Sequence, residues 1–164
     1  MSDRASRGVH PAPMNAEIEQ YLRSRVPLSA AMGLTVHAAG PRRVELRAPL
    51  APNANHIETV FGGSAVALAI LAAWTLLHVR QSGARTRATL LIQRSLMRYE
   101  RPITGDFEAV CELTDESSYD RFVRTLERRG RARITLCSLV LENGARAASF
   151  EGDFVAVRGS PASA

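Results

Sequence analysis

Residues 53–80 read NANHIETVFGGSAVALAILAAWTLLHVR, and a polar, turn-rich loop there runs directly into the most apolar stretch of the chain. From Ala65 to Leu77 no charged residue interrupts it. A helix that is apolar on every side must be surrounded by protein. Over residues 64–79 such a helix would be roughly 24 Å long at 1.5 Å per residue, about the width of a sheet of several strands. The stretch therefore predicts a buried central helix, which Ser82-Gly83 ends.

The remaining patterns are those of a mostly β chain with two amphipathic helices, one at its start and one before the last two strands. Apolar residues recur at helical spacing over 15–26, where Asn15 is placed to cap the helix, and over 118–129, which Gly130 closes. Extended runs and turn signals fill the rest, and Glu142-Asn143-Gly144 predicts a hairpin. We expect an α+β fold in which a curved antiparallel sheet covers the central helix. The strands expected are 34–37, 44–50, 86–99, 106–113, 131–142 and 146–157.

The length of 164 residues fits one domain, which we expect over residues 15–158, after a disordered leader at 1–14 and before a flexible tail at 159–164. The leader has no apolar segment typical of a secretory signal. The apolar run 65–79 is shorter than the ~18 residues of a membrane span. A cytoplasmic protein without a membrane segment is expected. Cys111 and Cys137 lack metal-ligand spacing, which predicts buried reduced thiols and neither a metal site nor a cofactor.

All 21 basic residues are arginine, the net charge is +5, and the one dense cluster of arginines lies within residues 121–133. The scarcity of aromatic residues beside these arginines disfavours a nucleic-acid-binding platform. We expect a surface position for the cluster, as a solvated face or as a contact for the phosphates of coenzyme A or for an acidic carrier protein.

The loop and the helix start resemble those of a known superfamily. Asn55, Glu58-Thr59 and Phe61-Gly62-Gly63 resemble the Asn, Gly-Thr and His-Gly-Gly of hotdog-fold thioesterases, and Tyr99-x-Arg101-Pro102 resembles the Tyr-x-Arg-Pro that ends their next strand. More narrowly, Asn53-x-Asn55, the run from Thr59 to Ser64 and Trp74 resemble the thioesterase domain at the C-terminus of YiiD-type bacterial proteins. The resemblance implies a hotdog fold, a homo-oligomer (a dimer or a dimer of dimers) and an acyl-CoA or acyl-carrier-protein thioesterase.

Two departures from that family pattern leave the activity open. Ile70 stands where much of the superfamily has an Asp or Glu on the central helix, and Phe61 replaces the His before Gly-Gly. The acid of an enzyme would then come from the loop or from a partner subunit. The alternatives are a non-catalytic acyl-thioester-binding protein and an enoyl-thioester hydratase or dehydratase, which would use the loop residue His56.

The candidate site comprises the loop and the helix start. Gly62 and Gly63 leave amides free to hold a thioester oxygen, and Ser64 is expected to cap the helix or contact substrate. Glu58 is the candidate general base, against the reading of a solvated loop residue, and His56 can orient or shuttle a proton. His78, at the far end of the helix, is expected to stabilise the helix C-terminus. The full candidate set is catalytic Asn55, His56, Glu58 and Thr59, and substrate-binding Phe61, Gly62, Gly63, Ser64 and Tyr99.

Overall fold

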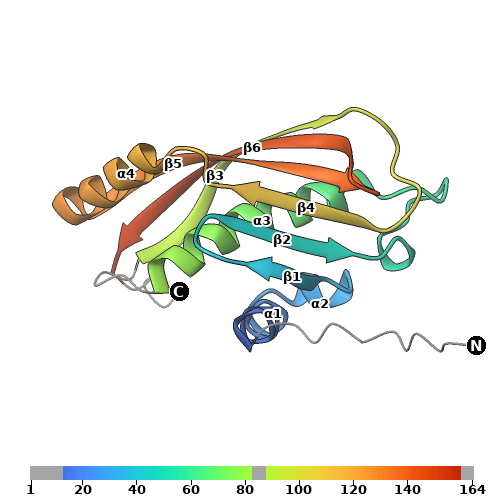
Figure 1. The fold of residues 1–164 in the computed structure, drawn as a ribbon, viewed down its shortest axis with the longest axis horizontal. Helices are drawn as coiled ribbons and strands as arrows, with labels where there is room; N and C mark the ends of the chain where they lie inside the picture. The colour runs from blue at the N-terminus through green and yellow to red at the C-terminus, as the bar shows by residue number, and fades with distance from the viewer. Residues whose placement is uncertain (1–12, 83–87, 160–164) are drawn as a thin grey trace, which may run out of the picture.

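In the computed structural model, which describes residues 13–82 and 88–159, six antiparallel strands form one sheet in the order β1-β2-β4-β5-β6-β3. Helix α3 (Gly62–Ser82) runs across one face of this sheet, as Figure 1 shows. This arrangement is the expected hotdog fold. The strands are β1 (Thr35–Ala39), β2 (Arg43–Ala48), β3 (Ala88–Tyr99), β4 (Phe107–Glu112), β5 (Arg131–Glu142) and β6 (Ala145–Arg158), and a 3₁₀ turn covers Ala51–Asn53.

Helix α3 forms the core with the inner face of the sheet. Leu68, Leu76 and Leu77 are fully buried, and Ser138 on β5 donates a hydrogen bond to the Ala69 carbonyl at 3.0 Å. With 21 residues, α3 is long and apolar enough to cross a membrane by length and composition. The length argument from the sequence was therefore wrong. Half of its most apolar window is buried inside the protein, and this packing identifies it as a core helix.

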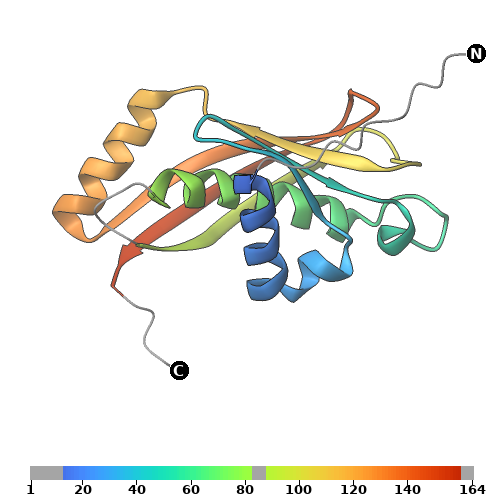
Figure 2. The ribbon, with the colours of Figure 1, turned by 60° about the horizontal axis from the view of Figure 1, so that its bottom comes forward.

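One edge of the sheet, β1, is covered by helix α1 (Pro13–Arg25), to which the short α2 (Pro27–Ala31) is joined (Figure 2). Asn15 lies inside α1 and is not its cap, because its side chain pairs with β1 instead. Its Nδ2 donates to the His37 carbonyl and its Oδ1 accepts from the Ala39 amide, both at 3.0 Å. One and two turns later along α1, Glu19 accepts from the Val36 amide at 2.9 Å and Arg23 donates to the Leu34 carbonyl at 3.0 Å.

The opposite edge of the sheet, β3, has no such cover among the described residues. Strand β3 pairs with β6 alone. Its large apolar side chains are exposed, including Leu91 at 55%, Leu96 at 44% and Tyr99 at 55%. The two edges of one sheet thus differ in both hydrogen bonding and polarity.

Helix α4 (Glu116–Arg129) lies at one end of the molecule, between β4 and β5 in the chain (Figure 1). Asp115 caps it by accepting from the Ser117 amide, and Gly130 ends it at φ 71°. Its apolar face is buried, and the Arg80 guanidinium at the end of α3 lies 3.8 Å from the Tyr119 ring centroid. The arginines of this region are exposed, as expected.

Several expectations about single residues need correction or fall outside the described residues. Helix α1 begins at Pro13, two residues before the expected domain boundary, while the rest of the leader and the tail after residue 159 lie outside the described residues. Cys111 is buried, which raises the pKa of its thiol to about 12, but Cys137 is exposed because it occupies an outward-facing position of β5. The hairpin prediction was right, with Asn143 at φ 52° and Gly144 at φ 76°.

Candidate functional site

The loop before α3 is anchored in the protein by Asn53. Its side chain is buried, and Nδ2 donates to the Met32 carbonyl at 2.9 Å and to the Pro49 carbonyl at 2.7 Å. Its own carbonyl accepts from the Phe61 amide at 2.8 Å. Asn53 therefore fixes both ends of the loop, which explains a polar residue in this buried position.

Asn55 and Thr59 close the loop on itself. Asn55 Nδ2 donates to Thr59 Oγ1 at 2.9 Å, and its Oδ1 accepts from the amides of Ile57 at 3.0 Å and Thr59 at 3.2 Å. The Asn55 amide also donates to the Thr59 carbonyl at 2.7 Å. Both ends of the Asn55 side chain are thus engaged in loop structure, and a catalytic part for this pair stays a prediction.

Glu58 and His56 are at the exposed tip of this loop. Neither side chain makes a hydrogen bond or ion pair with a residue in the described ranges. Glu58 has φ 61°, a left-handed conformation that disfavours residues with a Cβ. It occupies the position that is Gly in the resembling Gly-Thr pattern. The loop therefore presents a carboxylate to solvent at a backbone cost of roughly 1–2 kcal/mol.

The helix start brings together two amides without acceptors. Ser64 and Ala65 donate to the Phe61 carbonyl at 2.9 Å and 3.1 Å, but within the described residues the Gly62 and Gly63 amides have no acceptor. The first amides of a helix carry its positive dipole end and suit a developing oxyanion. Ser64 is the third residue of α3, so the expectation that it caps the helix was wrong, because Phe61 occupies the cap position.

The rings of Phe61 and Tyr99 lie against the two glycines, so a side chain at either position would have to displace a ring. A Cβ on Gly63 would lie 2.2 Å from the Phe61 ring, and a Cβ on Gly62 would lie 3.1 Å from the Tyr99 hydroxyl. That hydroxyl donates to the Gly62 carbonyl at 2.8 Å, and partial burial raises the pKa of Tyr99. Phe61 is 58% exposed, so an apolar ring and a phenol border the free amides.

The loop after β3 supports the site through an ion pair between Arg101 and Glu142. Glu142 accepts hydrogen bonds from the amides of Thr104 and Gly105, both at 2.7 Å, and pairs with Arg101. The Arg101 guanidinium, followed by the loop amides, holds the pKa of Glu142 below its usual range. The neighbouring Ile103 carbonyl accepts from the Val60 amide at 2.8 Å, and this bond connects the Glu142 anchor to the candidate site.

Five cavities of 310–680 Å³ on this chain are lined by residues outside 53–64. His78 lies in the wall of the 520 Å³ cavity at the far end of α3, and its ring contacts those of Tyr21 and Trp74 with centroids 4.7 Å and 4.8 Å away. Within residues 13–82 and 88–159, no three His, Cys, Asp or Glu side chains are grouped to hold a metal ion.

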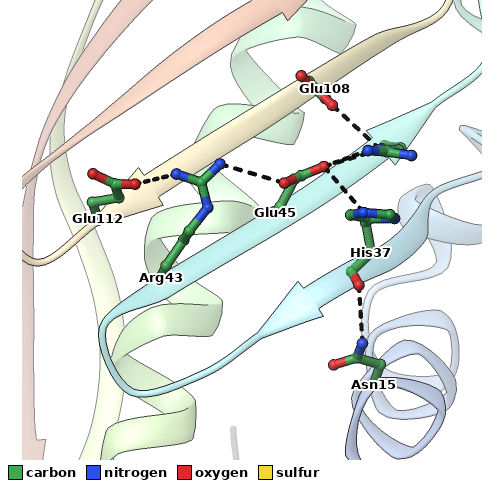
Figure 3. A network of polar contacts seen from close by, with 7 residues as sticks. Asn15, His37, Arg43, Glu45, Glu108 and Glu112 are labelled. Carbon is green, nitrogen blue, oxygen red and sulfur yellow. Dashed lines mark hydrogen bonds and ion pairs between the residues drawn. The ribbon is translucent and has the colours of Figure 1, made fainter. Parts of the chain in front are cut away.

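A polar cluster, shown in Figure 3, lies on the outer face of the sheet and was not predicted from the sequence. Glu45 accepts from Arg47 at 2.7 Å and 3.0 Å and from Arg43 at 3.4 Å, and His37 Nε2 lies 3.7 Å away. Burial opposes its ionisation, but these partners together hold the pKa of Glu45 below its usual value. Glu108 and Glu112 pair with the same two arginines, so the cluster links three strands. Charged residues at every second position of β2, and at two positions of β4, were the sequence signal that could have predicted this cluster.

Comparisons with known proteins agree with this geometry. A family model described as "Putative thioesterase (yiiD_Cterm)" matches residues 15–158. A Chlorobaculum tepidum protein of unknown function is 25% identical with a TM-score of 0.84, covering 89% of this chain and 95% of that one. A structure titled as a putative thioesterase from Shewanella oneidensis is 24% identical with a TM-score of 0.77, covering 88% and 97%. A Pseudomonas aeruginosa protein titled "Probable Thioesterase" is 24% identical with a TM-score of 0.75, covering 93% and 100%.

The last two structures show the fold alone, whereas the family model spans nearly the whole described chain and includes the candidate site. The chain belongs to the yiiD_Cterm thioesterase family, with a hotdog fold.

Proposed function

We propose that the protein hydrolyses an acyl thioester of coenzyme A or of an acyl-carrier protein, with the Gly62 and Gly63 amides as the oxyanion hole. The observation that carries the proposal is these two amides without acceptors at the start of α3, next to the exposed loop of a thioesterase family. Two apolar side chains of the loop are exposed, Ile57 at 63% and Phe61 at 58%, and suit a fatty-acyl chain.

The proposed reaction assigns one step to each of the site groups. Glu58 takes a proton from a water molecule, whose oxygen attacks the thioester carbonyl carbon. The carbonyl oxygen becomes an oxyanion and accepts hydrogen bonds from the two glycine amides. The carbon–sulfur bond then breaks as the carbonyl re-forms, the thiolate leaves and takes up a proton, and a carboxylic acid is released. His56 can orient the water or return the proton.

We further propose that the working form is a homodimer, or a dimer of dimers, formed through the open edge of β3. The observation that supports it is the set of exposed apolar residues on β3, among them Leu91, Leu96 and Tyr99. An unprotected apolar edge is a pairing surface. A second copy would continue the sheet and enclose the acyl chain beside α3. We place the protein in the cytoplasm, where the exposed Cys137 thiol would stay reduced.

Two substitutions of Glu58 test the general base. Glu58→Gln keeps the left-handed backbone and removes the base, so kcat on octanoyl-CoA should fall by about 10²–10⁴ with little change in KM. Glu58→Gly should lower kcat equally while raising the free energy of unfolding by about 0.5–1 kcal/mol, because the strain at φ 61° is relieved. His56→Ala should cost less activity. Near-native turnover of both Glu58 variants would mean that another group is the general base.

A second candidate function is non-catalytic binding of acyl thioesters. The observation that favours it is Ile70, which leaves the middle of α3 without an ionisable side chain. Release of free thiol from octanoyl-CoA, measured over many turnovers, separates the two functions. Tight binding of octanoyl-CoA without thiol release would favour the binding protein.

A further inference from the structure

The net charge of the protein is concentrated in one short segment. Residues 121–133 contain six arginines and one glutamate, Glu127, and so carry +5, which equals the net charge of the whole chain. The rest of the sequence is therefore formally neutral. The six residues, named here the α4 arginine patch, are Arg121, Arg124, Arg128, Arg129, Arg131 and Arg133.

The side chains of the patch are exposed and lack counter-ions within the described ranges. No carboxylate lies within ion-pair distance of them, whereas arginines elsewhere form such pairs: Arg23, Arg43, Arg47, Arg80, Arg94, Arg101 and Arg146. Arg121 and Arg133 act on Asp115 and Asp153 only at longer range. Like charges at this spacing repel one another and destabilise the free protein. An anionic partner would relieve that repulsion.

The surface of the patch is too extended for a nucleotide. Helix α4 has 14 residues, which corresponds to roughly 21 Å at 1.5 Å per residue. None of the five cavities is lined by a patch arginine, although small-molecule sites are concave. Spaced guanidinium groups on an open surface instead fit carboxylates spread over the face of an acidic protein.

Within one subunit the patch is far from the candidate site. Helix α4 is tied to the C-terminal end of α3, where Arg80 donates to Glu116 at 2.8 Å. The free amides are at the other end, about 30 Å away along 21 residues. A phosphopantetheine arm reaches roughly 20 Å, as judged from the extension of a chain with five or six residues. An arm of this length could therefore not carry an acyl group from the patch to the site of the same subunit.

Antiparallel pairing of two β3 strands removes this obstacle. Tyr99, at one end of β3, bonds to Gly62 at the candidate site. Ala88, at the other end, pairs with Arg158, whose amide donates to the Gly130 carbonyl at 2.8 Å, directly after α4. A twofold axis at the middle of β3 would bring the Ala88 end of one subunit beside the Tyr99 end of the other. The patch of each subunit is then separated by β6 and β3 from the strand that borders its partner's site, which is three strand spacings or roughly 14 Å.

We propose that the α4 arginine patch is the docking surface for an acidic carrier protein, which inserts its acyl-phosphopantetheine arm into the site of the opposite subunit. The inference rests on the proposed function and selects the carrier-bound thioester as the preferred substrate. The patch binds the carrier, and the site hydrolyses the thioester.

The test compares two substrates and two matched variants. Arg124→Ala/Arg128→Ala removes two patch charges from α4, and alanine preserves the helix. We expect kcat/KM on octanoyl-acyl-carrier protein to fall at least about tenfold and to lose part of its salt dependence. Hydrolysis of octanoyl-pantetheine, which has neither carrier nor phosphates, should change less than about twofold. Arg124→Lys/Arg128→Lys should restore most of the loss, and Arg25→Ala, at an exposed position of α1, should behave as the parent protein.

Binding of a fluorescent carrier protein, measured by anisotropy, makes the test independent of catalysis. If the parent protein hydrolyses none of these thioesters, the proposed reaction fails, but a tenfold weaker carrier Kd in Arg124→Ala/Arg128→Ala still supports the docking surface. An unchanged Kd overturns it. Equal losses on octanoyl-CoA and on the carrier substrate would identify a nucleotide site instead. Binding of single-stranded DNA as tight as that of the carrier, with the same loss, would identify a general polyanion surface, and either result overturns the proposal.

Discussion

Both edge strands of the sheet have backbone amides and carbonyls that face away from their neighbouring strand. Side chains of α1 bond to these groups at β1, whereas the edge of β3 is uncovered in the described part of the chain. At β1, the side chains of Asn15, Glu19 and Arg23 pair with the free amides and carbonyls, so no further strand can add there. At β3, exposed side chains of Leu91, Ile92, Leu96 and Tyr99 border an uncovered edge. Charged and amide side chains cover one edge of this sheet, and no comparable set covers the other edge within the described residues. The contrast supports the proposed pairing of a second subunit with β3.

Opening or blocking the β3 edge should have the largest effect. Leu91→Lys/Leu96→Lys places charges on the proposed interface, so the protein should become a monomer in sedimentation experiments at micromolar concentration. Because the site then lacks its second wall, thioester hydrolysis should fall by more than about 100-fold. Leu139→Lys is the matched control, since Leu139 is 41% exposed on the interior strand β5. A dimer that survives the double substitution would remove β3 as the interface.

The anchor behind the site should have the next largest effect. Glu142→Gln leaves Arg101 and the Thr104 and Gly105 amides with a weaker acceptor and should lower the free energy of unfolding by roughly 3 kcal/mol at pH 7. The folded-state pKa of Glu142 is lowered, so its contribution is present above the unfolded value of about 4.3 and is lost as the pH falls through the folded value.

Urea unfolding from pH 7 down to pH 3 checks both statements. The difference in stability between the parent protein and Glu142→Gln should narrow below about pH 4. Glu17→Gln, on the exposed face of α1, should match the parent protein throughout. A constant difference across this range would mean that the charge of Glu142 does not contribute, and that packing explains the loss.

The closed edge should give the smallest of these effects. Asn15→Ala leaves the buried Ala39 amide and the His37 carbonyl without their partner, and the free energy of unfolding should fall by about 2 kcal/mol. Glu17→Ala, exposed on the same helix, is the control. Equal stability of the two variants in urea unfolding would show that α1 covers β1 by packing alone. That result would weaken the contrast between the two edges.

Periodicity predicted most of the fold. The all-round apolar pattern over 64–79 located α3, and alternation located the strands, because both signals depend on local side-chain spacing. Asn15 was misread since a cap and a distant β-strand partner give the same sequence signal. Its contacts span 22 and 24 residues, which no local pattern reports.

The candidate site was located by the motif but not described by it. Asn55 and Thr59 were found by spacing, yet only coordinates show that they pair with one another. The left-handed backbone of Glu58 had one available signal, the glycine at that position in the resembling pattern. Ser64 was assigned to the cap because serine is common there, but α3 begins two residues earlier, at Gly62. A wall contributed by a second copy, as proposed for this site, would leave no local pattern in a single sequence.

The pairing of β3 also has a consequence for synthesis of the chain on the ribosome. Its only partner within the described sheet is β6, the last strand to be made, and about 45 residues separate the end of β3 from the start of β6. At 5–20 residues per second, β3 waits roughly 2–9 s without a neighbour on either side. The contacts that close β1 join residues only 11–24 positions apart and can form early. Nascent chains on one messenger would therefore be vulnerable to premature pairing through β3, and a slower start of translation should improve the yield of folded protein.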